Sequence, residues 1–444
     1  MYKFCLETDK NAFEQFVLEN KGLYMQSAKW ADVKLEWKSR FYSGFNANGE
    51  RVLTALIMER SIPLAGKIWY SPAGAVCDYS DAELIKEFSL FIKDEMKKNG
   101  AAALFFDPCI ELRNNSQTNE FGKKVHDTLV STGFKLNPDA SKCLYKAPVQ
   151  LILPLYNDDG SVKTAEKLLK SFEKGVRYSA RVGENRGLTQ EVYTIEDIEK
   201  DESIMQDFLD VMKDTSERSN FVERGGEYCK RLMRVFGKEN MDMMLIYYDK
   251  NKDKQLENER LAKKEALLKS LETAPEKKKK GMLEEIDAID KQSEHYLARV
   301  EETKNEEKDR ICVSGGITVH YAGMSSCLFG GSKNLLRNNL RSSHYFNYRR
   351  IVRSIEKGSA FHDLGYVLLK PSAPNPDGTL GACVPSEDFE GICAFKKSFG
   401  ADYIEYIGEY VLVANKAAYF SYTLLIEKAR KAQSVVNRIV KARR

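Results

Sequence analysis

The sequence predicts a mixed α/β protein that carries a long helical hairpin in its second half. Three observations lead to this prediction. More than half of the stretch from Asp249 to Arg310 is charged, with 16 Lys or Arg and 17 Asp or Glu residues. Strand-like apolar runs flank that stretch directly on both sides. A phrase of helix, glycine, short strand and aspartate occurs twice, once around Gly100 and once around Gly358.

The charged stretch 249–310 has the pattern of an antiparallel two-helix coiled coil. Its apolar residues recur in steps of 3, 4 and 7, the spacing of a narrow helix–helix seam: Leu261, Leu268, Leu271, Ile286, Ile289, Tyr296 and Val300. Pro275 and Gly281 bracket the run Lys277–Lys280, where the chain would reverse. Each helix would be roughly 30 Å long. The flanking runs 243–248 and 311–321 make this an arm inserted between two strands.

Composition limits the classes of protein. The chain has 444 residues, 43% hydrophobic content and a net charge of +4, which fits two or three domains and does not by itself imply nucleic acid. Nine Cys residues include no C-x-x-C, and five His residues stand far apart, which disfavours a zinc site. With no signal peptide and no long apolar run, we expect a cytosolic protein with reduced thiols.

The first block, to about residue 149, predicts helices and strands in alternation. Asn48-Gly49 is a favoured hairpin turn, and Ser80-Asp81 caps a strong helix that Gly100 ends. A short apolar strand then runs into Asp107-Pro108. The expected elements are helices over 11–20, 26–35 and 82–99, and strands over 41–45, 51–58 and 102–106.

The second block contains the repeated phrase. A helix over 342–357 ends at Gly358 and is followed by a strand over 360–365. The repetition indicates a duplicated α/β domain, but helix, glycine and strand also follow one another in unrelated α/β proteins, so both explanations stay open. Further helices are expected over 171–187, 204–213 and 226–236, a loop over 371–381, and a basic terminal helix over 416–444 with a net charge of +7.

Motifs of common enzyme classes are missing. Phe329-Gly330-Gly331-Ser332-Lys333 has the wrong spacing for a phosphate-binding loop, and there is no G-x-G-x-x-G, no acyl-CoA loop and no G-x-S-x-G. A nucleophilic or metal-dependent enzyme is therefore disfavoured.

A series of short phrases resembles one family when it is taken in order. The series is Gln26-Ser27-…-Trp30-Ala31-…-Val33-Lys34, Asp107-Pro108, Arg177-Tyr178-…-Arg181-…-Gly187, Phe221-…-Arg224-…-Tyr228, Phe329-Gly330-Gly331-Ser332-…-Arg337, Phe395-Lys396-…-Phe399-Gly400 and Ile404-Glu405-Tyr406-Ile407-Gly408-Glu409. Together with the inserted arm, it resembles the Fem family of aminoacyl-tRNA-dependent peptidyltransferases, which build the interpeptide bridge of peptidoglycan. The resemblance covers nearly the whole chain.

The resemblance implies two acetyltransferase-like (GNAT-like) α/β domains. The first would span 1–149 and be completed by 403–444, the second would span 150–402, and the arm 249–310 would mark the type that acts on lipid-linked precursor. Such an enzyme transfers Gly, Ala or Ser from aminoacyl-tRNA, its co-substrate, to a stem-peptide amine, and it needs no other cofactor. The implied partners are tRNA, a lipid II type precursor, the inner membrane face and a homo- or heterodimer.

The resemblance also implies roles for individual residues. Lys34, Arg224 and Tyr228 would hold the precursor diphosphate, a group that suits Lys and Arg; Arg224 and Tyr228, four residues apart, are expected on one helical face. Lys396, or its neighbour Lys397, would lie near the acceptor end of tRNA and stabilise charge on an ester or ribose oxygen. Asp107 would orient or deprotonate the attacking ammonium. For each cation the alternative is a solvated surface charge or strand-end lysine, and for Asp107 a turn-forming Asp-Pro.

Two departures from the family pattern and two other functions stay open. Asp363-Leu364-Gly365-Tyr366 stands where the family has Asp-Phe-Gly-Gly, and Leu328 replaces an aromatic residue, so substrate preference is in question. The chain could instead transfer amino acids to protein N-termini, or be a non-catalytic coiled-coil scaffold that binds RNA or protein. The basic segment 416–444 would suit either an anionic membrane surface or tRNA phosphates.

Overall fold

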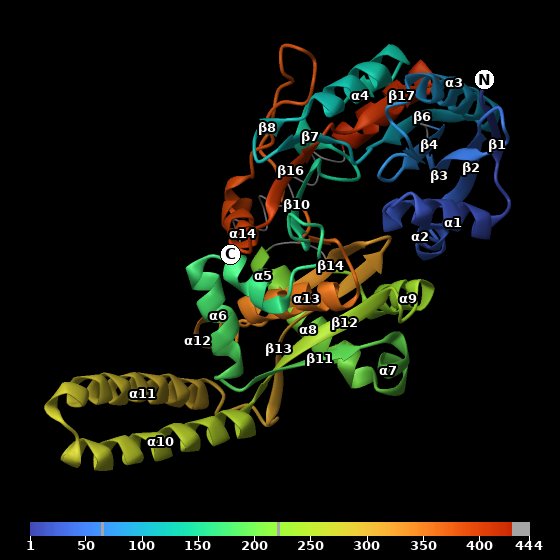
Figure 1. The fold of residues 1–444 in the computed structure, drawn as a ribbon. Coiled ribbons are helices and arrows are strands. Elements are labelled where there is room, and N and C mark those ends of the chain that lie inside the picture. The colour runs from blue at the N-terminus through green and yellow to red at the C-terminus, as the bar shows by residue number, and fades with distance from the viewer. Residues whose placement is uncertain (64–65, 220–222, 429–444) are drawn as a thin grey trace. The chain divides into compact units, whose positions relative to one another are not determined.

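The computed structural model describes residues 1–63, 66–219 and 223–428, and it divides into two compact units (Figure 1). Unit 1 consists of Met1–Ile152, Leu364–Lys397 and the chain from Ala401 onward, and unit 2 of Leu153–Asp363 and Ser398–Gly400. The predicted second domain, 150–402, differs mainly in the segment 364–397, which lies in unit 1, as do 150–152 and 401–402. Hydrogen bonds explain the place of 364–397 in unit 1: the buried Arg113 guanidinium binds the carbonyls of Leu380 and Gly381 at 2.9 and 2.8 Å.

Unit 1 is built on a mixed sheet with strand order β1-β2-β3-β4-β6-β17-β9, in which β5 also pairs with β3. Only the β4–β6 pair of this sheet is parallel. The elements that form or cover it are β1 (Lys3–Leu6), α1 (Lys10–Glu19), α2 (Ala28–Val33), β2 (Lys38–Phe45), β3 (Arg51–Ile62), β4 (Gly66–Ser71), β5 (Val76–Cys77), α3 (Ala82–Asn99), β6 (Ala101–Phe106), α4 (Glu120–Ser131), β9 (Lys135–Leu136) and β17 (Tyr410–Val413).

A second group of unit 1 strands runs β10-β16-β7-β8, with each printed pair antiparallel. These are β10 (Val149–Pro154), which leads into unit 2, β16 (Asp402–Tyr406), β7 (Glu111–Asn114) and β8 (Gln117–Thr118). Unit 1 also contains 3-10 turns η1 (Tyr24–Gln26) and η2 (Ala140–Lys142), helix α14 (Glu387–Lys397) and a helix over 416–428. The rest of the predicted terminal helix, 429–444, lies outside the described residues.

Unit 2 contains the strand order β11-β12-β13-β14-β15, with one parallel pair, β14–β15. Its elements are α5 (Ala165–Ser171), α6 (Lys174–Glu184), β11 (Leu188–Tyr193), α7 (Ile195–Lys200), α8 (Glu202–Ser219), α9 (Gly226–Phe236), β12 (Met241–Asp249), α10 (Lys250–Thr273), α11 (Glu276–Glu302), β13 (Arg310–Tyr321), β14 (Met324–Ser332), α12 (Arg337–Leu340), α13 (Ser342–Glu356) and β15 (Phe361–Asp363).

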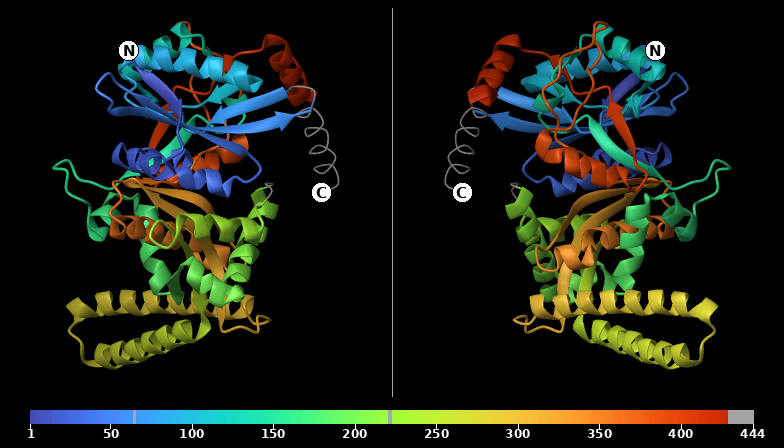
Figure 2. Two further views of the ribbon diagram at one scale, coloured as in Figure 1. Left: turned by 90° about the vertical axis from the view of Figure 1, so that its right-hand side faces the viewer. Right: turned by 90° about the vertical axis from the view of Figure 1, so that its left-hand side faces the viewer.

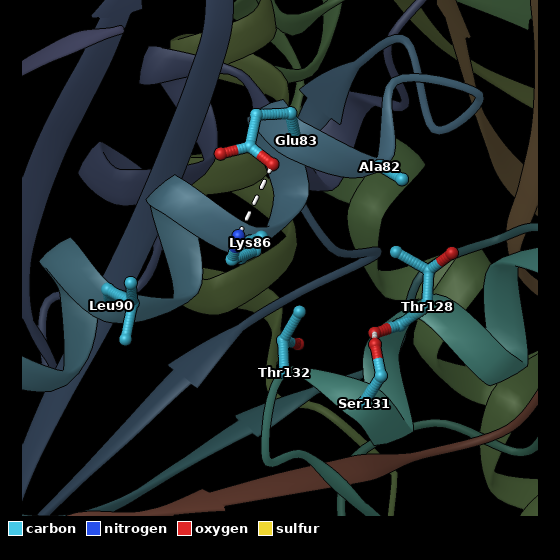
Figure 3. A pocket seen from close by; sticks show the side chains of 7 residues that line it. All are labelled: Ala82, Glu83, Lys86, Leu90, Thr128, Ser131 and Thr132. Carbon is cyan, nitrogen blue, oxygen red and sulfur yellow. Dashed lines mark hydrogen bonds and ion pairs between the residues drawn. The ribbon is translucent and has the colours of Figure 1, made fainter. Parts of the chain in front are cut away.

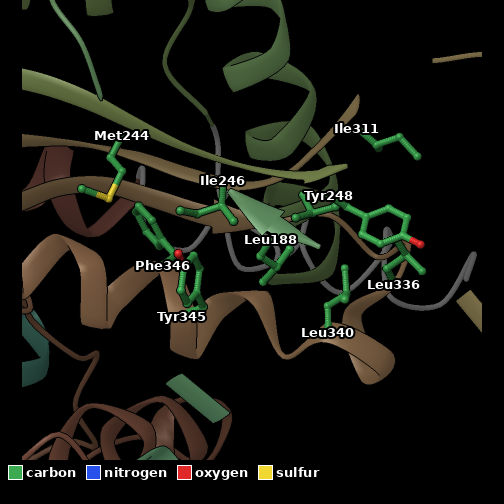
Figure 4. Close-up of a cluster of buried hydrophobic side chains, with 10 residues drawn as sticks. Leu188, Met244, Ile246, Tyr248, Ile311, Leu336, Leu340, Tyr345 and Phe346 are labelled. Carbon is green, nitrogen blue, oxygen red and sulfur yellow. The ribbon is translucent and has the colours of Figure 1, made fainter. Parts of the chain in front are cut away.

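The core of unit 2 lies where α12 and α13 pack on the sheet (Figure 4). Tyr345 and Phe346 of α13 meet Met244 and Ile246 of β12, and all four are almost fully buried. Tyrosine and phenylalanine rings bury large apolar areas, so this cluster contributes much of the unit's stability.

The mixed α/β class is as predicted, and the repeated phrase has the same local structure at both places. Gly100 and Gly358 both have left-handed backbone, with φ of 69° and 70°. Each follows a long helix, α3 or α13, and precedes a strand that runs parallel to a neighbour, β6 beside β4 and β15 beside β14. The predicted helix 171–187 is present as α6 but is shorter: it begins at Lys174, because the extended backbone of Phe172 (φ −71°, ψ 154°) ends the preceding α5, and it ends at Glu184.

The predicted arm is a helical hairpin of α10 and α11 in unit 2 (Figure 2). Asp249 caps α10, accepting a hydrogen bond from the Lys252 N–H, and Pro275 begins α11. The predicted seam is buried only in part: Ile286 and Ile289 are buried, whereas Leu261, Leu268 and Val300 are each more than two-fifths exposed. Two helices without a third partner leave one side of an apolar stripe open to water.

The glycines of the Phe-Gly-Gly-Ser phrase allow α8 to approach β14 closely. A Cβ on Gly331 would lie 2.3 Å from Thr215 Oγ1, whose hydroxyl accepts a hydrogen bond from the Ser332 N–H at 3.0 Å. We therefore expect Gly331→Ala to lower the free energy of unfolding by about 1–3 kcal/mol, measured by urea denaturation. Gly281→Ala in α11 is the matched control: its Cβ meets open space, so an increase of about 0.5–1 kcal/mol is expected. Equal effects at both positions would contradict the packing explanation.

Candidate active site

Asp107 lies at the end of the buried strand β6 and is held from two sides. The Tyr70 hydroxyl donates to Oδ2 at 2.9 Å, and the Ala73 N–H donates to Oδ1 at 2.6 Å. Ala73 has φ of 60°, a strained left-handed conformation for a residue with a Cβ. Burial raises the pKa of Asp107 to about 6, while Lys146 and the two hydrogen bonds oppose that rise. A carboxyl with this pKa can accept a proton near neutral pH.

Glu409 is a second buried carboxyl beside Asp107. Strands β6 and β17 are antiparallel with Phe106 opposite Tyr410, so the next residues, Asp107 and Glu409, extend from the same end of the pair. Burial raises the pKa of Glu409 to about 7, and the negative charge of Asp107 contributes to the rise. Its carboxylate accepts hydrogen bonds from Asn137 Nδ2 and the Leu144 N–H. Two neighbouring buried carboxyls disfavour ionisation of both.

A small cavity opens next to Asp107. Its volume is about 10 Å³, room for about one water molecule. Lys146 is the cation at its wall: its Nζ lies 2.6 Å from Cys109 Sγ and 4.9 Å from the centre of the Tyr406 ring. The lining residues are Asp107, Pro108, Lys146, Ala147, Pro148, Tyr406 and Gly408. The cavity thus combines a base of raised pKa with a lysine.

A larger hollow of about 300 Å³ lies between α3 and α4 (Figure 3). Its charged residues, Glu83 and Lys86, are exposed and form an ion pair with each other at 3.4 Å. This hollow contains none of the residues that the sequence predicts for the site.

Lys34 directly follows α2, which the Ser27 hydroxyl caps. Its ammonium lies 4.8 Å from the centre of the Trp30 ring, a cation–π contact. Gln26 is the first residue of the Gln26–Lys34 phrase, and its amide is buried. The amide donates to the Pro72 carbonyl at 2.5 Å and accepts from the Leu56 N–H at 2.8 Å. Gln26 therefore joins the Lys34 segment to the loop that presents the Ala73 N–H to Asp107.

Aromatic rings also join the Lys34 segment to Asp107. Tyr70, which donates to Asp107, stacks on Tyr145 with ring centres 4.1 Å apart. The centre of the Trp37 ring, three residues after Lys34, lies 6.3 Å from the centre of the Tyr70 ring and 5.7 Å from that of Tyr145. Unit 1 thus brings the predicted residues Lys34 and Asp107 into one connected region.

Arg224 and Tyr228 are in unit 2, and their predicted relation needs a correction. They do not share a helical face, because α9 begins at Gly226 and Arg224 precedes it. They still meet, since the Arg224 guanidinium lies 5.2 Å from the centre of the Tyr228 ring. Phe221 of the same phrase lies outside the described residues.

Lys396 lies in the last turn of helix α14 in unit 1, so the alternative of a strand-end lysine is wrong. Its Nζ donates to the Tyr366 carbonyl at 2.8 Å. Tyr366 belongs to Asp363-Leu364-Gly365-Tyr366, one of the two departures from the family pattern, so this departure bears on the position of Lys396. The neighbouring Lys397 is directed to the Tyr403 ring, 4.7 Å away.

Sequence reasoning missed Glu409, Lys146 and Tyr70. Glu409 carried a signal, a carboxylate inside the apolar run 404–413, but its partner is about 300 residues away in the chain. Lys146 and Tyr70 carried no signal among many similar residues.

Within the described ranges, no group of three or more His, Cys, Asp or Glu side chains could hold a metal ion, and no helix is long and apolar enough to cross a bilayer.

A Ser–His–Asp arrangement in unit 2 is closed to substrate. His320 Nδ1 lies 2.6 Å from Ser325 Oγ, and its Nε2 lies 3.3 Å from Asp242 without hydrogen-bond geometry. Ser325 is fully buried, so a substrate cannot reach its hydroxyl. The arrangement stabilises the sheet and does not supply a nucleophile.

Comparison with known proteins defines the class. Residues 8–427 match the model of the FemAB family, so the chain belongs to that family and is an aminoacyltransferase, as predicted. A lipid II:glycine glycyltransferase of Staphylococcus aureus strain MRSA252 is 26% identical over 442 residues, which cover 96% of this chain and 97% of that protein. The protein of that name from strain MSSA476 is 25% identical over 433 residues, 95% of each chain.

A solved structure supports the fold. The crystal structure of FemX superposes with a TM-score of 0.72 at 25% sequence identity, covering 94% of this chain and 98% of that one. The likeness therefore extends over both units and is not limited to one of them.

Proposed function

We propose that this enzyme transfers an amino acid, glycine first among the candidates, from aminoacyl-tRNA to a stem-peptide amine of a lipid-linked peptidoglycan precursor. The observation that carries the proposal is the nearly end-to-end similarity to lipid II:glycine glycyltransferases. Alanine and serine are the other candidate amino acids. Contact of the basic segment 416–444 with the inner membrane face, and a dimer with a related transferase, belong to the same proposal.

The reaction needs positioning and one proton acceptor. The amine nitrogen attacks the carbonyl carbon of the aminoacyl ester, a C–N bond forms, and the bond from carbon to the ribose oxygen breaks. Asp107 takes a proton from the attacking ammonium or amine, and the ribose oxygen gains a proton as it leaves. Because an ester is already activated, alignment of two bound substrates can supply up to roughly 7–11 kcal/mol of the barrier.

The other predicted residues have roles in this scheme. Lys34 contacts the precursor diphosphate as a compact charge, and Arg224 can bind phosphate oxygens bidentately. Lys396 stabilises negative charge on the ester or ribose oxygen. The Lys396–Tyr366 hydrogen bond and the half-buried position of Lys396 limit the number of places its ammonium can occupy.

A transfer assay across charged tRNAs tests the proposal. Purified enzyme is mixed with radiolabelled glycyl-, alanyl- or seryl-tRNA and a water-soluble lipid II analogue. We expect label in the muropeptide with at least one tRNA, and a reduced rate for Lys34→Ala that higher precursor concentration restores. No transfer with any of the three would contradict the proposal. Equal transfer to a peptide that lacks the sugar diphosphate would favour the protein N-terminal transferase instead.

A further inference from the structure

Four cations lie on α9 or just before it, and only two of them are neutralised. Lys230 pairs with Glu202 and, at 3.3 Å, with Glu227, while Arg234 pairs with Glu199 at 2.5 Å. Arg224 and Arg231 form no ion pair with any carboxylate in the part of the chain that the structure describes. Two guanidiniums without a carboxylate, beside two paired cations, leave net positive charge at this end of α9.

Arg224 and Arg231 converge on a single aromatic ring. Their guanidinium carbons lie 5.2 and 5.4 Å from the centre of Tyr228. Tyr228 and Arg231 are three residues apart in α9 and so share one helical face. Phe329, from the Phe-Gly-Gly-Ser phrase on β14, meets the Tyr228 ring edge-on at 6.5 Å. We call Arg224, Tyr228 and Arg231 the Tyr228 platform.

One atom of the platform lacks a partner. Arg231 Nε is buried and has no hydrogen-bond acceptor among the described residues. A buried N–H without an acceptor costs free energy that a ligand oxygen would recover. The acidic residues nearest in sequence make no ion pair with either arginine in the described chain: Glu223 adjoins Arg224, and Glu227, four residues before Arg231, pairs with Lys230 at 3.3 Å.

The platform suits an anion with two charged centres. Each guanidinium presents a planar fork that matches two phosphate oxygens, and two forks on one ring match two linked phosphates. The adjacent end of α9 adds to the positive potential, because Gly225 at its N-cap has no side chain to satisfy the first N–H groups.

We propose that Arg231 is a binding residue for the precursor diphosphate, with Tyr228 placing its guanidinium beside that of Arg224. The proposal rests on the proposed function, because it assigns one more residue to the same substrate. It predicts that the second phosphate contact in unit 2 comes from Arg231, which no sequence phrase singled out.

Equilibrium binding of two soluble lipid II analogues tests the role of Arg231. One analogue keeps the diphosphate and the other has a neutral linker in its place; catalysis is not needed for the measurement. Arg231→Gln should weaken binding of the diphosphate analogue by about tenfold to hundredfold and leave binding of the neutral analogue unchanged. Arg231→Lys, which keeps charge but not the planar fork, should give a smaller loss. Arg234→Gln, one turn along α9, is the matched control and should bind like wild type.

Two results would overturn the proposal: Arg231→Gln binding the diphosphate analogue like wild type, or losing affinity for both analogues equally. The second result would mean that Arg231 only supports the local structure. Thermal unfolding of each variant shows whether it is folded, and Arg231→Lys provides the comparison if Arg231→Gln is not. Failure of the proposed function would look different, because the wild-type enzyme would bind the diphosphate analogue but transfer no amino acid.

Discussion

Arg299→Ala is expected to lower the free energy of unfolding by about 3–5 kcal/mol, because it leaves a buried carboxylate without its cation. Arg299 and Asp253 are 1% and 0% exposed at the base of the arm. Their contact is bidentate, with Arg299 Nε 2.7 Å from Asp253 Oδ2 and Nη2 2.8 Å from Oδ1. After the substitution, Asp253 would keep the Tyr248 hydroxyl at 2.8 Å and only a distant cation, Arg260, whose Nη2 lies 3.9 Å from Oδ1.

Urea denaturation of Arg299→Ala and of a control variant measures this effect. Lys291→Ala removes an arm pair of similar length, 2.7 Å to Asp287, whose side chains are about two-thirds exposed. It should cost less than about 1 kcal/mol, because solvent screens exposed pairs. The double variant Arg299→Met/Asp253→Leu should recover much of the loss, since an apolar pair leaves no buried charge. Similar losses for Arg299→Ala and Lys291→Ala would refute the anchoring role.

The same pair determines how the arm can be tested. Deletion of the whole arm, 251–309, would remove both Asp253 and Arg299 and so expose the part of unit 2 on which the arm is anchored. A shortened arm that lacks 262–292 keeps both. If this protein retains tRNA binding and amino acid transfer, the substrate contacts lie outside the distal arm.

The sequence predicts the arm well but not its anchor. Spacing of apolar residues over several turns is a local signal, so both helices and their turn can be located from it. Asp253 and Arg299 look like ordinary charges in a run of charges, and 46 residues separate them. Burial of this pair depends on where β12 and β13 hold the two helix ends, which local sequence does not encode.

For the site as well, features with a local sequence signal could be predicted and features that depend on distant residues could not. Helix α3, its glycine end and strand β6 follow from capping residues and apolar runs, so Asp107 could be placed at a strand end. Its raised pKa could not, because the cause is burial, and burial depends on how residues far apart in the chain, among them Tyr70 and Lys146, pack around Asp107. The sequence predicts Arg224 and Tyr228 on one helix because they are four residues apart. Arg224 instead precedes the helix, which begins at Gly226.

Asp107→Asn should reduce kcat by about 10²–10⁴-fold if Asp107 accepts the proton, the range typical of a general base. The amide keeps the shape: its oxygen can accept the Ala73 N–H, and its NH2 group can donate to the Tyr70 hydroxyl, which reverses that hydrogen bond, so precursor binding should change little. In the wild type, the rate should rise as pH increases through about 6, where Asp107 ionises. Rates measured from pH 5 to 8 with saturating substrates test both expectations, and a fall in kcat of less than about threefold would exclude this role.

Glu409→Gln supplies the matched variant. It keeps an oxygen that can accept the Leu144 N–H. Because the pKa of Glu409 is raised to about 7, Glu409 is mostly protonated near pH 6, where Asp107 ionises, so the rise in rate should stay near pH 6 in this variant. Stability gives an independent readout. The pKa of Asp107 is raised in the folded state to about 6, above an unfolded value of about 3.9. Folding therefore favours the protonated form, and wild-type stability should decline as pH rises from about 4 through 6. The decline should be smaller in Asp107→Asn but not absent, because Glu409, whose pKa is raised to about 7, contributes a decline of its own. A wild-type protein whose stability is constant over this range would show that Asp107 is not held in a site that resists its charge.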